Sequence, residues 1–471
     1  MALKRDLSYF DLTNIIVGAI IGSDIYIASA ITAGLIGPFS IIVWVVAGVI
    51  ATILAMIFAY SSYYVPKVGG SFAYVSTAFD EFWGFLAGWS MWIAEVLSLP
   101  VFALTFANYL QYYVQLSLAE QVLVKGAFLF GLTAVNIFGV KAAGRLNDVL
   151  TIGKLSPLLL IIIVGLGSFL YRPGAFISNY TPLLPFGLGN NFGTALVLVF
   201  WAYVGFELGT LPAAEVKDPR KTIPKAIVTG MAIVTFFYLS TNFVIFGAVS
   251  SPELAGTSVP LVNVSLALLG TTGAAIIIIG ALVSVSGSDE SGMLGTGRLT
   301  YAMAIDGLFP KAFARVHPKF KTPYIALIAQ ALIAFVLSNF YGLSNLISFS
   351  VFNLAFSFLL VSLSFLVLKR KGEKGLYGQN VLPWLGVGIC SYLLYSTAFF
   401  PDKVVGSILV LLGVPLYVYF SPKADIKHLK DLFTSEEAVF ARSLERKNRF
   451  LANLVRMGHG AYKRARRKRG P

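Results

Sequence analysis

Long apolar segments alternate with short polar loops over most of the chain. A helix needs about 20 apolar residues to cross the hydrocarbon core of a bilayer. Within lipid, a helix also satisfies its own backbone polar groups. The pattern therefore predicts twelve membrane-spanning helices and an all-α integral membrane protein. The predicted spans are residues 11–35, 40–64, 82–113, 121–139, 147–170, 190–213, 225–249, 269–303, 323–340, 345–369, 380–399 and 403–420.

Composition supports this interpretation. The 471 residues are 57% hydrophobic and only 12% charged, whereas soluble domains carry about 25% charged residues. A chain with so few charges cannot cover itself with a polar surface, which argues against a soluble globular protein. The first apolar stretch is too long for a cleavable signal peptide and lacks a processing site.

The net charge of +14 does not indicate a nucleic-acid partner, because the basic residues lie in loops and in the C-terminal tail. Their distribution instead indicates which loops lie on which side of the membrane. Cytoplasmic loops of membrane proteins are enriched in Lys and Arg. Only Lys125, Arg172 and Lys403 fall on the side opposite to the termini, and Lys154 falls inside a span. We therefore expect a multi-pass plasma-membrane protein with a cytoplasmic N-terminus, residues 1–10, and a basic cytoplasmic tail, residues 421–471.

The tail has a pattern of its own. Thr434 and Glu437 have the spacing of a capping box, and apolar residues then recur at helical spacing ahead of the basic cluster from Lys463 to Arg469. An amphipathic basic helix would bind anionic lipids of the inner leaflet. A solvated tail without fixed structure is equally compatible with this sequence.

Two predicted spans are interrupted near their middle. The first contains Gly22, Ser23 and Asp24, and the sixth contains Gly205 followed by Glu207. Paired interruptions in corresponding helices indicate the substrate site of a transporter, because half-helix termini offer free N–H and C=O groups there. The alternative is that each glycine only permits close helix packing.

Three motifs carry a resemblance. They are Gly205-Phe206-Glu207 with Ala214 to Pro224, Gly297 to Pro310 with His317 to Pro323, and Pro66, Gly69, Gly70, Ser71 and Tyr74. In these motifs the chain resembles the amino acid–polyamine–organocation transporters, and the similarity extends over about residues 8–420.

The resemblance implies alternating access and the five-plus-five inverted-repeat fold shared with the leucine transporter. Residues 11–170 would form the first repeat and 190–369 the second, with two further helices over 380–420. The function it implies is secondary active transport of amino acids, proton-coupled and sodium-independent.

The resemblance also implies a substrate site at the two interruptions. The substrate carboxylate would face the N–H groups around Gly22, Ser23 and Asp24, and the substrate amino group would meet backbone carbonyls on both broken helices. Trp201 matches an aromatic gate, although a packed core aromatic is the alternative. The expected substrate-binding residues are Ile20, Gly22, Ser23, Asp24, Phe200, Trp201, Ala202 and Val204.

Lys154 matches a lysine of proton-coupled relatives that stands where sodium binds in sodium-coupled proteins of this fold. A buried lysine loses proton affinity on desolvation and can cycle its charge. The alternative is a lysine permanently paired with a carboxylate. The expected coupling residues are Lys154, Glu207, Asp289 and Glu290.

Asp24 departs from the family pattern. A carboxylate beside a pocket for a substrate carboxylate would repel the substrate unless Asp24 is protonated or holds a cation. Glu95, Glu207, Asp289 and Glu290 add further intramembrane acids, and such acids are functional candidates by default. Two alternatives follow: transport of amines or polyamines, or transport of an inorganic cation such as potassium.

Other chemistry is not predicted. The sequence has no catalytic constellation, no clustered Cys/His metal site and no nucleotide-binding loop, so we expect neither an enzyme nor a cofactor. The single cysteine, Cys390, lies in an apolar run typical of core packing. The three histidines lie outside the spans, so a proton relay would depend on carboxylates and Lys154.

Overall fold

The computed structural model describes residues 7–66, 69–138, 140–187, 189, 191–210, 216–369 and 378–421, with the side chains of 140–152 and 399 left out. Within these ranges the chain forms helices and no strand, which confirms the all-α prediction. The expectations for the tail fall on residues outside these ranges.

The N-terminal half contains two short helices in place of one continuous first span. Its elements are α1 (Tyr9–Ile20), α2 (Asp24–Ile36), η1 (Gly37–Phe39), α3 (Ser40–Tyr64), α4 (Ser71–Ala78), α5 (Glu81–Gln111), α6 (Leu118–Phe138), α7 (Val140–Tyr171) and α8 (Pro173–Ser178).

The C-terminal half begins with a second interrupted helix. Its elements are α9 (Asn191–Ala202), η2 (Phe206–Thr210), α10 (Pro219–Ala248), α11 (Ser251–Ala255), α12 (Pro260–Ile305), η3 (Lys311–Ala314), α13 (Tyr324–Phe340), α14 (Leu343–Leu368), α15 (Leu382–Ser396), η4 (Phe399–Lys403) and α16 (Val404–Phe420).

Nine segments within the described ranges are long and apolar enough to span a membrane, and three shorter apolar helices accompany them. The three shorter helices are α1, α13 and α15. This confirms a protein with many apolar helices. The division into twelve spans and two inverted repeats stays a prediction.

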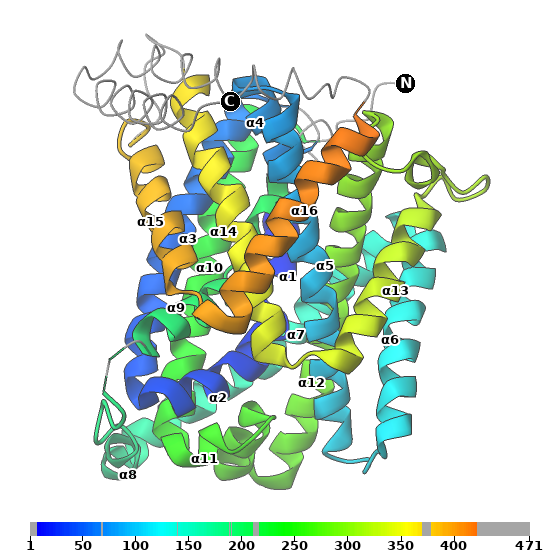
Figure 1. The fold of residues 1–471 in the computed structure, drawn as a ribbon. Coiled ribbons are helices and arrows are strands. Elements are labelled where there is room, and N and C mark those ends of the chain that lie inside the picture. Colours follow the sequence, from blue (N-terminus) through cyan, green and yellow to red (C-terminus); the bar gives the residue numbers. More distant parts are fainter. Residues whose placement is uncertain are drawn as a thin grey trace.

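The helices form a bundle with a buried centre (Figure 1). In α5, 83% of the most apolar stretch is buried, against 22% in the segment of α16. Helix α5 packs against α14, α12 and α4, and α9 packs against α2 and α3. Peripheral helices turn large apolar side chains outward, for example Leu170 and Phe236. An apolar outer surface of this extent fits lipid as the solvent.

Helix α12 differs from its predicted range. The predicted span starts at residue 269, but the helix starts at Pro260, where proline suits the first turn. Gly270 interrupts it with a positive φ of 67°, a conformation that glycine adopts without steric cost. The apolar run therefore continues through a kink that the hydrophobic pattern did not show.

Candidate functional site

The first interruption lies between α1 and α2. Gly22 donates its N–H to Asp24 Oδ1 at 2.8 Å, so the carboxylate caps the break from within. A side chain on Gly22 would have to fit within 2.8 Å of Ser288 on α12. Gly22 therefore serves both the turn and the close approach of α12.

The second interruption lies between α9 and η2 and repeats the same arrangement. Gly205 has a φ of +124° and donates its N–H to Glu207 Oε2 at 3.1 Å. In both breaks a glycine amide is thus bound by an acid two residues further on. Both acids are buried, with Asp24 3% and Glu207 1% exposed.

The two interruptions lie against each other. A Cβ atom added to Gly205 would stand 3.1 Å from the Ile20 nitrogen and 3.2 Å from the Ala19 carbonyl carbon. These neighbours are backbone atoms at the end of α1, which cannot move aside like a flexible side chain. The structure therefore brings the two broken helices into direct backbone contact.

We expect Gly205→Ala to lower the free energy of unfolding by about 1–3 kcal/mol, because alanine is strained at this φ and its Cβ crowds α1. Gly388→Ala is the matched control, because nothing lies within 4 Å of a Cβ at this position in α15. Thermal unfolding of the purified variants measures both effects. Equal stability of Gly205→Ala and the control would contradict the tight contact.

Tyr238 of α10 joins the two breaks. Its hydroxyl lies 3.1 Å from the Ile20 carbonyl and 3.0 Å from the Ala202 carbonyl, and it donates to Asp24 Oδ2. One side chain thus contacts the ends of α1 and α9 together with the carboxylate at the start of α2. Sequence analysis missed Tyr238, because its only signal was a hydroxyl within a long apolar helix.

The carbonyl groups expected to receive a substrate amine are those of Ile20, Trp201 and Val204. The Ile20 carbonyl lies 3.1 Å from the Tyr238 hydroxyl, whose single proton is donated to Asp24. The Trp201 carbonyl accepts the N–H of Val204 at 3.1 Å. The Gly22 amide, expected to receive a substrate carboxylate, is bound by Asp24. Ser23 Oγ is buried and without a hydrogen-bond partner among the described residues, so it is available to a ligand.

Lys154 of α7 reaches the first break. Its Nζ donates to the Gly18 carbonyl and to Ser288 Oγ at 3.2 Å. Ser288 in turn donates to the Ile21 carbonyl at 2.9 Å. The lysine side chain is 0% exposed, and no salt bridge to it occurs within the described part of the chain. Its Nζ is therefore bound by oxygen atoms of α1 and α12.

Trp201 is held in place by two serines. Its indole N–H donates to Ser98 Oγ at 3.1 Å, and Ser98 Oγ lies 3.2 Å from Ser350 Oγ. The indole ring lies 5.8 Å from the ring of Phe102. Trp201 thereby connects α9 with α5 and α14 beside the breaks. Its neighbour Phe200 is fully buried and packs against Phe358 of α14.

The acids of α12 are buried but less connected. Asp289 is 0% and Glu290 1% exposed. Both oxygens of Asp289 and one of Glu290 lack a hydrogen-bond partner among the described residues. Ser288 contacts the first break, and Asp289 follows it about 100° further around the helix. Among the described residues, no contact places Asp289 at the breaks. The charged groups that interact with Lys154 are Asp24 and Glu290.

A metal centre is not seen in the described ranges, where no three His, Cys, Asp or Glu side chains gather at ligand distance.

Comparison with known proteins adds to this geometry. The profile of the family described as Amino acid permease matches residues 7–418. The chain is 29% identical to the methylthioribose transporter of Bacillus subtilis (strain 168), covering 89% of this chain and 93% of that protein. It is 30% identical to the serine/threonine exchanger SteT of the same organism, covering 88% and 96%. It is 31% identical to the large neutral amino acids transporter small subunit 2 of Mus musculus, covering 90% and 83%.

Proposed function

The chain belongs to the amino acid permease family, and from this premise we propose that it transports amino acids across the cell membrane by alternating access. The observation that carries the proposal is the pair of facing helix interruptions, each with a glycine amide and an acid. Secondary transporters bind small polar solutes beside such interrupted helices. Transport of serine, threonine and large neutral amino acids by the named relatives supports this substrate class.

The proposal includes the finer architecture. Twelve spans, with α1 to α7 and α9 to α14 as inverted repeats, would place the two breaks in corresponding helices. Both termini would lie in the cytoplasm, as the distribution of Lys and Arg favours.

We further propose that transport is coupled to protons and independent of sodium. Lys154 supports this, because its ammonium group is bound by the Gly18 carbonyl and the Ser288 hydroxyl. Such oxygen ligands would otherwise suit a metal cation. A buried lysine that gains and loses a proton as solvent access alternates could couple proton flow to transport.

A second substrate class is favoured by Asp24. Its carboxylate occupies the Gly22 amide and accepts a hydrogen bond from Tyr238, so the anion-binding end of the site is filled by the protein itself. A solute that lacks a carboxylate, such as an amine, then avoids repulsion. The named methylthioribose transporter is a relative whose solute is not an amino acid.

Thermal stability of the purified protein distinguishes these substrate classes. A ligand that binds only the folded state stabilises it by about 2.7 kcal/mol at 100 times its dissociation constant. We expect zwitterionic amino acids to raise the unfolding temperature, and radiolabelled uptake into proteoliposomes to follow the same order. Stabilisation by amines alone would replace the amino acid proposal, and stabilisation by K⁺ alone would indicate a cation transporter.

A further inference from the structure

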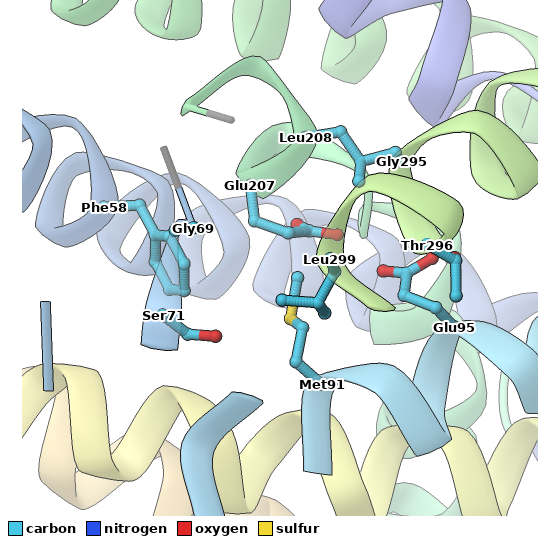
Figure 2. A pocket seen from close by; sticks show the side chains of 11 residues that line it. Phe58, Gly69, Ser71, Met91, Glu95, Glu207, Leu208, Gly295, Thr296 and Leu299 are labelled. Atoms are coloured by element: carbon cyan, nitrogen blue, oxygen red, sulfur yellow. The ribbon is translucent and has the colours of Figure 1, made fainter. Parts of the chain in front are cut away.

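A small cavity lies beside the second break, between α4, α5, η2 and α12 (Figure 2). Its apolar wall includes Phe58, Met91 and Leu299. Its polar wall contains two carboxyl groups, those of Glu95 on α5 and Glu207 on η2. The space between the side chains is large enough for about one water molecule, which is too small for an amino acid.

The two carboxyl groups are a buried pair. Glu95 is 8% and Glu207 1% exposed, and Figure 2 shows their carboxyl groups turned toward each other. Both line the same small cavity, and a hydrogen bond between two carboxyl groups requires a proton on one of them. Two ionised carboxylates on one small cavity in a low-dielectric interior would repel strongly.

Unpaired polar atoms point to something held between these groups. One oxygen of each glutamate, Oε1, has no hydrogen-bond partner among the described residues. The hydroxyl of Ser71 at the start of α4 lines the same cavity, is buried, and is likewise unpaired. Buried polar atoms are rarely left without partners, so three of them around one space indicate a bound proton and water.

Other charged groups do not neutralise the pair. Within the described part of the chain, neither glutamate forms a salt bridge, and the only charged side chain found to act on Glu95 is Glu207. On α12, Arg298 acts on Glu290, and Lys154 is bound at the first break. The hydroxyl of Tyr74 on α4 is the remaining titratable group on that helix, and it is itself buried.

We propose that Glu95 and Glu207 form a proton-binding site, in which one shared proton and one water molecule bound to Ser71 fasten η2 to α5. This site is separate from Lys154. The proposal does not depend on which solute the protein transports. Loss of the shared proton leaves two like charges between η2 and α5 and favours their separation. The cavity would then widen at the second broken helix.

Infrared spectroscopy of the full-length protein in lipid nanodiscs tests the site directly, because a protonated carboxylic acid has its own C=O stretching band. At neutral pH, we expect the intensity of this band in the wild type to exceed that in Glu95→Gln/Glu207→Gln by the contribution of one protonated carboxyl group. Glu253→Gln, an exposed acid on α11, is the matched control and should leave the band unchanged. Equal bands in wild type and double variant would overturn the proposal.

Single variants keep the test decisive if the double variant does not fold. The wild-type pair should take up its two protons in two separate steps over a pH titration, because the first proton relieves the repulsion. Glu95→Gln and Glu207→Gln should each show one step. Loss of the wild-type band on adding Na⁺ or K⁺ would instead show that the carboxylates bind a metal cation, and would also overturn the proposal.

Discussion

Replacing Lys154 with alanine is expected to lower uptake driven by a pH gradient at least about tenfold, while solute exchange without a gradient continues. The variant removes the only cation that the structure places at the Gly18 carbonyl and Ser288 hydroxyl in the described ranges. Hydrogen bonds to charged groups contribute about 1.5–3 kcal/mol each, so the free energy of unfolding should fall as well. Proteoliposomes with an imposed pH gradient measure the uptake.

Lys125→Ala is the matched control for this experiment. Lys125 of α6 is also buried and donates to a backbone carbonyl, that of Ser338, at 2.9 Å. Its loss should reduce stability to a similar degree without changing the response to the pH gradient. Full gradient-driven uptake by Lys154→Ala, or sodium-dependent uptake that survives the substitution, would contradict proton coupling through Lys154.

Replacing Asp24 with glycine is expected to shift ligand preference toward zwitterionic amino acids at least about tenfold, or about 1.4 kcal/mol. The substitution frees the Gly22 amide, which Asp24 now occupies, and removes a negative charge from the place where a substrate carboxylate would bind. Competition binding with an amino acid and its decarboxylated amine measures the ratio.

Asp24→Asn distinguishes the effect of the negative charge from the effect of the hydrogen bond to the Gly22 amide. Its one side-chain oxygen can still accept the Gly22 N–H, but the amide nitrogen that replaces the second oxygen cannot accept from the Tyr238 hydroxyl, and the charge is gone. We expect a smaller shift than for glycine, since the amide stays occupied. The same ligand order in wild type, Asp24→Gly and Asp24→Asn would mean that Asp24 does not determine the substrate class.

The local interruptions were largely predictable. Glycine weakens a helix at any interior position, as Gly22 and Gly205 do here. An acidic side chain two residues later can reach back and accept the N–H of the glycine. Both breaks therefore lie within the ranges that the sequence indicated, and the burial of Lys154 followed from its place inside an apolar run. Helix boundaries were less predictable, as the earlier start of α12 and its kink at Gly270 show.

The sequence by itself determined that this protein is a bundle of apolar helices, that two of them break, and which side chains are acidic within them. These properties depend on neighbours within about one helical turn, or on composition over about 20 residues. Only the tertiary structure decided what the breaks contact. Tyr238 meets Asp24 across 214 positions of sequence, and Lys154 meets Gly18 across 136. The Glu95 and Glu207 pair likewise exists only because α5 packs beside η2, since periodicity reveals which face of a helix is buried but not which helix covers it.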